Sequence, residues 1–190
     1  INTGYRNLNK MTGGLQRSDL IIVAARPSMG KTAFALNLAI NAAEGNEMHP
    51  GVPVAVFSLE MSMEQLMQRM LCARGRVNLG KLRSNILNDD DWDGLITAAD
   101  VFSHAQVYID DTPALSIGEL RARARRLARD KGIKMIMIDY LQLMRASRRV
   151  DSRELEISEI SRGLKALAKE LNIPVIALSH LNRNVEARRD

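Results

Sequence analysis

The stretch formed by residues 19–37 constrains this chain more than any other. It begins with a short apolar, β-branched run at residues 20–24, of the kind that forms a buried strand. A tight loop ending in Gly30, Lys31 and Thr32 follows, and after it come strong helix formers without a breaker. A strand, a loop and a helix in this order are what a phosphate-binding loop requires, so we expect an α/β fold built around this unit.

The residue types of the loop suit a triphosphate. Backbone N–H groups at the helix start can point at phosphate oxygens, and the helix dipole adds to their attraction. Lys31 can reach the outer phosphates, the Thr32 hydroxyl can hold a magnesium ion, and Gly30 lets the backbone approach without a Cβ in the way. The usual first glycine is Ala25 here. A chance match in an ordinary strand–turn–helix unit is the alternative, which the surrounding pattern disfavours.

Composition bounds the class of protein. With 190 residues, of which 46% are hydrophobic, the chain fits one α/β domain with a real core. A net charge of +5 and a pI of about 9.7 permit an anionic partner without demanding one. Cys72 is the only cysteine, so no intrachain disulfide can form. No membrane-length apolar run or signal peptide is visible, so we expect a cytoplasmic protein without a membrane partner.

Four further apolar runs alternate with helical patterns. Strands are expected at residues 53–57, 107–109, 135–138 and 174–178, and helices at 63–73, after 89–91, after 116 and at 153–171. Ser62 with Gln65 and Ser116 with Glu119 predict capping boxes. Strands that alternate with helices predict a parallel, doubly wound sheet. Residues 46–51 are expected to form a surface loop, and 74–87 have no clear pattern. The acidic triplet 89–91 is interpreted as helix capping rather than metal binding, and its helix as carrying one apolar face: Trp92, Leu95, Ile96 and Ala99.

Ligands of such sheets bind at the carboxyl ends of the strands. Glu60, Asp110, Asp139 and His180 each follow an apolar run directly, which predicts one shared site. Asp139 and Asp110 compete for the magnesium-supporting role, and the fully apolar run before Asp139 favours it. Glu60 is a candidate general base, or a carboxylate that caps the next helix. His180 could hydrogen-bond the terminal phosphate, although the residues alone slightly favour a satisfied histidine at a strand end.

The basic residues divide into two groups. One group lies on the helix that starts after Ser116 and is interpreted mostly as a solvated face: Arg121, Arg123, Arg125, Arg126 and Arg129. The other group follows the Asp139 strand in a loop with few acids nearby: Arg145, Arg148 and Arg149. Basic loops suit contacts with phosphate backbones, and an aromatic content of 4% argues against base stacking.

Taken together, these motifs resemble the C-terminal motor domain of bacterial DnaB-type replicative helicases. The matching stretches cover nearly the whole chain: residues 12–15, 25–32, 57–61, 138–144, 156–162 and 177–183. The resemblance implies a RecA-like P-loop NTPase fold, with a parallel doubly wound sheet. It also implies a homohexameric ring that binds ATP and Mg2+ between subunits and moves along single-stranded DNA from five-prime to three-prime. Primase and a helicase loader are the further partners that it implies.

The resemblance also assigns roles to single residues. The eight loop residues would bind ATP: Ala25, Arg26, Pro27, Ser28, Met29, Gly30, Lys31 and Thr32. Thr32 and Asp139 would hold the metal, Glu60 would be the catalytic base, and His180 would be the nucleotide sensor, where most members are expected to carry glutamine. Three arginines would form a central DNA-binding loop: Arg145, Arg148 and Arg149.

By the same resemblance, residues 1–190 are expected to form one motor domain without the family's N-terminal helical domain. Its last strands, a second DNA loop and the arginine finger are expected beyond residue 190. Three alternatives remain open on the sequence: a RecA-like ATPase of recombination or clock type without helicase activity, a small-molecule kinase, and a non-catalytic nucleotide-binding module. Glu60 and the basic loop favour a nucleic-acid ATPase over a kinase.

Overall fold

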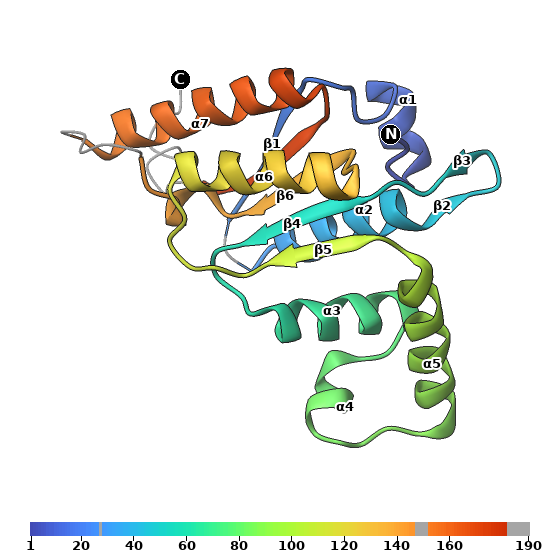
Figure 1. Ribbon diagram of the computed structural model, residues 1–190. Helices are drawn as coiled ribbons and strands as arrows, with labels where there is room; N and C mark the ends of the chain where they lie inside the picture. Colours follow the sequence, from blue (N-terminus) through green and yellow to red (C-terminus); the bar gives the residue numbers. More distant parts are fainter. Residues whose placement is uncertain (27, 147–151, 182–190) are drawn as a thin grey trace, which may run out of the picture.

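A computed structural model describes residues 1–26, 28–146 and 152–181 of the chain (Figure 1). The helices are α1 (Arg6–Thr12), α2 (Lys31–Glu44), α3 (Met63–Gly75), α4 (Leu79–Arg83), α5 (Asp89–His104), α6 (Ile117–Lys131) and α7 (Arg153–Leu171), with a 3-10 turn η1 (Leu141–Leu143). The strands are β1 (Leu20–Ala25), β2 (Gly45–Asn46), β3 (His49–Pro50), β4 (Val54–Ser58), β5 (Val107–Asp110), β6 (Met135–Asp139) and β7 (Val175–His180). None of the helices in these ranges is long and apolar enough to cross a membrane.

Five of the strands form one parallel sheet in the order β1-β7-β6-β4-β5, which confirms the predicted parallel α/β architecture. The strand that comes last in the described chain therefore lies between the first strand and β6. All five strands end at the same edge, on the left of Figure 1. That edge collects the residues that follow each strand, because carboxyl ends of parallel strands point the same way.

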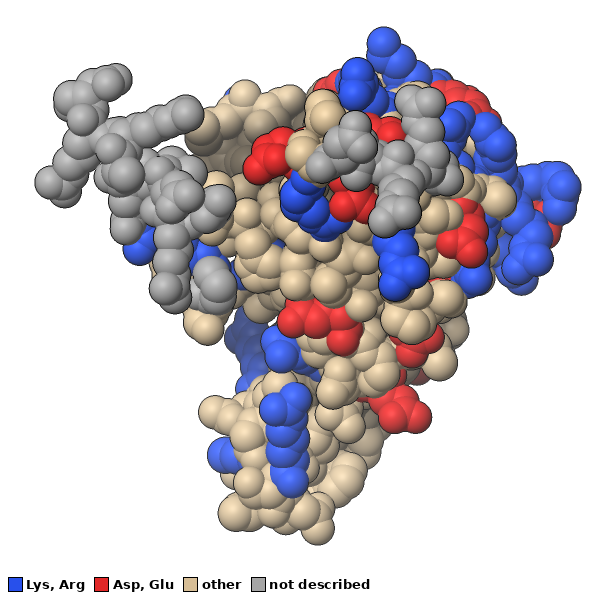
Figure 2. All heavy atoms as spheres, turned by 90° about the vertical axis from the view of Figure 1, so that its left-hand side faces the viewer, with Lys and Arg blue, Asp and Glu red and all other residues tan. Residues whose placement is uncertain are grey.

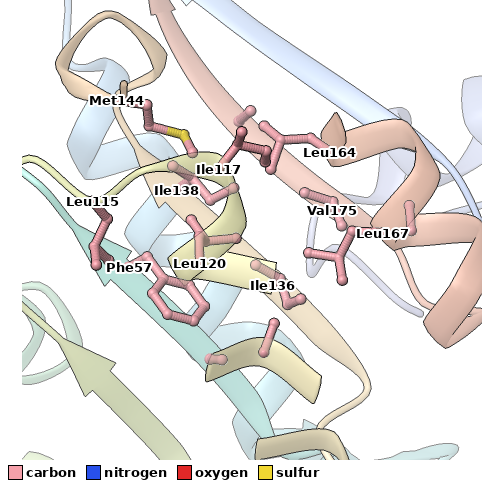
Figure 3. Packing of buried hydrophobic residues seen from close by; sticks show 14 of the residues in the cluster. Phe57, Leu115, Ile117, Leu120, Ile136, Ile138, Met144, Leu164, Leu167 and Val175 are labelled. Carbon is pink, nitrogen blue, oxygen red and sulfur yellow. The ribbon is translucent and has the colours of Figure 1, made fainter. Parts of the chain in front are cut away.

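Successive residues of the central strands point to opposite faces of the sheet and belong to two separate hydrophobic clusters. One face of the sheet packs against α6 and α7, as Figure 3 shows for ten labelled residues: Phe57, Leu115, Ile117, Leu120, Ile136, Ile138, Met144, Leu164, Leu167 and Val175. The other face packs against α2 and α3 through Val56, Met137, Ile176 and Leu178, among others. Because β4 and β6 are buried along their whole length, they read in sequence as continuous apolar runs.

The helix starts follow the predicted capping chemistry. Ser62 with Gln65 and Ser116 with Glu119 form the two predicted capping boxes. Asn88 and Asp91 form a third at the start of α5, and the Asp91 carboxylate also accepts a hydrogen bond from Lys81 Nζ at 2.9 Å. This geometry agrees with the interpretation of the acidic triplet as a helix cap.

Two local predictions were wrong, and one stretch without a prediction has structure. Residues 45–50 contain the short β2–β3 hairpin rather than a plain loop, and α4 forms within the stretch that showed no clear pattern. The predicted apolar face of α5 points outward, since Trp92 is 50% and Ile96 64% exposed. Gly94 of α5 instead lies against Gly75 of α3, where a Cβ on Gly94 would come within 2.5 Å of the Gly75 carbonyl oxygen. Two helices that cross at glycines turn their small-residue sides inward, and the larger side chains are left outside.

The core of α7 gives a test of the packing. Leu164 is fully buried, whereas Leu155 on the same helix is 52% exposed. Leu164→Ala should lower the free energy of unfolding by about 2–5 kcal/mol, because it leaves a cavity between α7 and the sheet. Leu155→Ala should change it by no more than about 0.5 kcal/mol. Urea unfolding followed by circular dichroism measures both values, and equal losses would contradict the described packing.

Candidate phosphate-binding site

The loop between β1 and α2 owes its shape to two residues in the left-handed region. Ser28 has φ of 65° and Gly30 has φ of 80°, and Gly30 is the N-cap of α2. A Cβ on Gly30 would meet no protein atom within 4 Å, so the backbone conformation explains the glycine, and the space in front of it is open. Ala25 is the last residue of β1 and pairs in register with His180, so this position is extended and needs no glycine. Pro27 lies outside the described residues.

The start of α2 presents donors and no competing acid. Phe34 N donates to Gly30 O at 2.9 Å, while the N–H groups of the three preceding residues have no acceptor within the helix. The first turn of this 14-residue helix contains no acidic side chain. The positive end of the helix dipole therefore faces the loop without a carboxylate of the helix's own first turn to neutralise it.

Thr32 and Asp139 join the loop helix to β6. Thr32 Oγ1 donates a hydrogen bond to Asp139 Oδ2 at 2.9 Å. Asp139 is fully buried and Lys31 is only 8% exposed. Among the described residues, neither Asp139 Oδ1 nor Lys31 Nζ has a hydrogen-bond partner. Two buried, oppositely charged groups thus each keep an atom that could still form a hydrogen bond or bind a metal.

Burial acts on both charges in opposite directions. Burial lowers the pKa of Lys31, and the negative charges of Asp139 and Glu60 only partly oppose this effect. Burial raises the pKa of Asp139, against the Thr32 hydrogen bond and the charge of Lys31. A phosphate oxygen at Lys31 and a divalent cation at Asp139 would each favour the charged form.

The donor set fits magnesium held together with a phosphate. No cluster of three or more His, Cys, Asp or Glu side chains that could hold a metal exists in the described part of the chain. Mg2+ is commonly bound through one or two carboxylates, substrate phosphates and water, so it does not need such a cluster. Thr32 and Asp139 provide two oxygens of the right kind beside the helix start.

Glu60 lies on the wall of the same cavity, which has a volume of about 370 Å3. A tight turn after β4 places it there, in which Ser58 Oγ donates to Met61 O at 2.7 Å and accepts from Met61 N at 3.2 Å. Leu59 N also donates to Asp139 O at 2.8 Å, which ties this turn to the end of β6. Glu60 does not cap α3, because Ser62 and Gln65 fill that role. The carboxylate is exposed and directed to the cavity side of the turn.

His180 lines the cavity from the end of β7. Its ring meets the Tyr140 ring edge-on with centroids 4.2 Å apart, and Lys31 Nζ lies 4.8 Å from the centroid of that tyrosine ring. His180 Nδ1 is buried without a hydrogen-bond partner within the described ranges. A purely structural histidine at a strand end would be expected to have both ring nitrogens hydrogen-bonded, and this nitrogen is not.

Asp110 does not join the other strand-end residues. Arg123 Nη1 binds Asp110 Oδ2 at 2.7 Å and also donates to Thr112 Oγ1. Burial raises the pKa of Asp110, but these hydrogen bonds and the Arg123 charge outweigh it and hold the pKa below its usual value. The prediction of one site for all four residues was thus wrong for Asp110, because β5 is an edge strand beside α6.

Sequence analysis missed one residue that lines the cavity, Arg69, and one that packs beside it, Tyr140. Arg69 of α3 lines it together with Arg26, and Arg69 Nε is buried with no hydrogen-bond partner among the residues described. The only signal is its place on α3 between Leu66 and Met70, which are both buried. Tyr140 follows Asp139 directly and lies in the matching stretch 138–144, but the sequence assigned it no role, whereas its ring contacts His180. Both side chains depend on how distant segments come together.

The basic residues behave differently from one another. On α6, Arg121 and Arg125 both bind Glu170, lowering its pKa to about 2, as expected for a largely solvated helix face. Arg145 is exposed. Hydrogen bonds from Ser116 lower the pKa of Glu119, those from Ala146 and Arg153 lower the pKa of Glu156, and the nearby charge of Arg145 adds to both effects, so two acids lie near it. Figure 2 shows acidic and basic side chains interspersed on this side of the molecule. Arg148 and Arg149 lie outside the described residues.

Removal of the buried ammonium tests the site. We expect Lys31→Ala to weaken binding of a fluorescent magnesium–nucleoside triphosphate by about 10- to 150-fold, because one charge-assisted hydrogen bond is removed. Lys10→Ala, on the exposed surface of α1, is the matched control and should leave the affinity unchanged. Unchanged affinity in the Lys31 variant would exclude this cavity as the phosphate site.

The chain is similar to known replicative DNA helicases. The chain is 55% identical to the replicative DNA helicase DnaB of Geobacillus stearothermophilus and 54% identical to the replicative DNA helicase DnaC of Bacillus subtilis, over 191 aligned residues in each case. Each match covers all of this chain and 41% of the relative, so the chain spans about two fifths of the length of these relatives.

A solved structure of a DnaB-like replicative helicase, described with its interactions with primase, is also similar. It superposes with a TM-score of 0.90 at 37% sequence identity, over 100% of this chain and 45% of that one. This likeness confirms the expected RecA-like fold. The family model of the DnaB-like helicase C-terminal domain matches residues 1–190, and the chain therefore belongs to that family.

Proposed function

We propose that this chain is the ATP-hydrolysing motor of a replicative DNA helicase. The observation that supports this most is the paired geometry of Lys31 and Thr32 with Asp139, beside a carboxylate at Glu60. In this proposal the chain works within a homohexamer that moves along single-stranded DNA from five-prime to three-prime and separates the duplex. Primase is a proposed partner, by analogy with the similar helicase structure that is described with primase.

The loop and the start of α2 bind the phosphates. Backbone N–H groups of the first turn donate to phosphate oxygens, and Lys31 neutralises the outer ones. Thr32 and Asp139 hold Mg2+, which when bound would neutralise charge developing on the phosphoryl oxygens. Because Asp139 is buried beneath Thr32, the metal-binding oxygens are fixed before the nucleotide arrives.

Glu60 orients and deprotonates the attacking water. Its place on the wall of the cavity that Lys31 also lines, on a turn fixed by Ser58, supports this role. His180, which lines the same cavity, detects the terminal phosphate. Arg69 supplies further positive charge from α3, on the same cavity.

Hydrolysis without loss of binding is the test of this assignment. Glu60→Gln should bind ATP as tightly as the wild type, while the hydrolysis rate falls by roughly a hundred- to ten-thousand-fold, because the amide cannot accept the proton. Glu64→Gln, an exposed acid in the first turn of α3, is the control and should keep full activity. Parallel loss of binding and turnover in the Glu60 variant would point to a structural role instead.

The DNA contact is proposed at the basic segment after β6. Its first arginine, Arg145, is held by its main chain, since its N–H donates to Leu115 O at 3.2 Å and its carbonyl accepts from Ile117 N at 3.0 Å. The side chain is exposed beside Glu119 and Glu156. We expect a phosphate to compete with these carboxylates for the guanidinium, so that the contact carries charge but no base information.

Salt dependence measures these contacts. Replacing two of Arg145, Arg148 and Arg149 by alanine should weaken single-stranded DNA binding for every sequence. It should also reduce the slope of log affinity against log salt by about 0.7 for each phosphate that the variant no longer neutralises. A double variant of Arg126 and Arg129 on α6 is the control, with an unchanged slope expected. If the two double variants behave alike, the DNA-binding surface lies elsewhere.

A further inference from the structure

A side chain outside the cavity, Gln142 of η1, holds the end of the strand that carries His180. Gln142 Nε2 donates to Ser179 Oγ at 2.8 Å and to His180 O at 3.1 Å, and Gln142 Oε1 accepts from His180 N at 3.3 Å. Both main-chain polar groups of His180 are therefore bonded to one amide. Asparagine would be too short by one methylene to make the same contacts from this position.

These hydrogen bonds occur where the backbone pairing between β6 and β7 has ended. β6 and β7 pair only from Ile136 with Val175 to Ile138 with Ala177, so the last three residues of β7 have no partner on β6. β1 pairs with β7 along its whole length on the other side. On the β6 side, the end of β7 is thus held by a side chain, which can yield more readily than a continuous ladder of backbone hydrogen bonds.

The main chain of Gln142 continues the network away from the cavity. Its carbonyl oxygen accepts a hydrogen bond from Arg153 Nη2 at 2.5 Å, at the first residue of α7. Arg153 pairs with Glu156, and Glu156 Oε1 accepts from Ala146 N at 3.1 Å. Hydrogen bonds therefore run from the main chain of His180 through Gln142 to the start of α7 and to the residue that follows Arg145.

The residues on both sides of Gln142 are tightly packed, so we expect η1 to move as a rigid unit. Leu141 and Met144, on either side of Gln142, are buried in the cluster between the sheet and α6 and α7. Arg145 follows at once, and its backbone is bonded to the segment before α6. A shift of Gln142 would be transmitted to these neighbours, because close-packed side chains do not deform independently.

We propose that Gln142 is a positioning residue that couples the occupancy of the phosphate cavity to the DNA affinity of the segment carrying Arg145. The inference rests on the function proposed above. When His180 moves toward a terminal phosphate or away from it, its N–H and carbonyl move with the ring, and Gln142 is bonded to both. Gln142 then shifts η1 and, through Arg153 and Glu156, the backbone at Ala146. Nucleotide state and DNA affinity are thereby linked in both directions.

The experiment measures single-stranded DNA affinity of the native full-length protein with ADP and with a non-hydrolysable ATP analogue. For the wild type we expect the ratio of the two affinities to lie in the range of about 5 to 150 that is typical of coupled sites. Gln142→Ala and the nearly isosteric Gln142→Glu, which loses both donors, should bring the ratio to within about threefold of one. Arg153→Gln breaks the network on its far side and should act in the same way.

The matched control is Gln16→Ala. Gln16 Nε2 also donates to main-chain carbonyls, those of Thr12, Gly13 and Gly14, but it lies beside α1 away from the cavity. Its ratio should equal that of the wild type. Thermal unfolding checks each variant, and if Gln142→Ala does not fold, the Glu variant and Arg153→Gln provide the same test from two sides.

Each other outcome has a distinct meaning. Gln142 variants that keep the wild-type ratio overturn the inference, and so do variants whose DNA affinity falls equally in both nucleotide states, since that fall indicates a merely structural role. A wild type that binds DNA with a ratio of one shows that no coupling exists. A wild type that binds ATP but no single-stranded DNA overturns the proposed function itself, and the coupling with it.

Discussion

The hydrogen bond from Thr32 to Asp139 is the interaction on which the site depends. It joins the helix that follows β1 to the end of β6, although β7 lies between those two strands in the sheet. The hydrogen bond therefore links the two elements on either side of the end of β7, and it limits which side chain fits at that end. His180 occupies this place, with Lys31 and Tyr140 beside it. One strand order thus sets the spatial relation of phosphate loop, metal ligand and histidine.

This arrangement has an energetic cost that the rest of the fold must offset. Lys31 and Asp139 are both buried, and each keeps an atom without a hydrogen-bond partner in the described structure. Buried charges that are not fully paired destabilise a folded protein. The sheet can carry them because its two faces are covered by separate hydrophobic clusters, one under α6 and α7 and one under α2 and α3. A charged ligand that pairs with Lys31 and Asp139 would remove this cost, and its binding would be more favourable for that reason.

Sequence reasoning succeeded where a local rule decides the structure. Continuous apolar runs predicted the strands, and serine three residues before glutamine or glutamate predicted the capping boxes. It failed where the partner comes from a distant segment. Arg123 diverts Asp110, and the crossing of Gly75 with Gly94 reverses the face of α5. Arg69 lies in no motif, and Gln142 lies in a matching stretch but was assigned no role, because only the assembled sheet brings them to the cavity or to His180.

The position of β7 beside β1 also affects the order in which the strands can pair during synthesis. Leu20 of β1 pairs with Val175 of β7, so β1 has no neighbour in the described sheet until β7, much later in the chain, has left the ribosome. At about 5–20 residues per second, the wait is roughly 10–30 seconds. During this interval β4, β5 and β6 can already pair with one another, while β1, which precedes the phosphate loop, is still unpaired. The phosphate loop, the most recognisable stretch in the sequence, therefore acquires its structure only after β4, β5 and β6 have been able to pair.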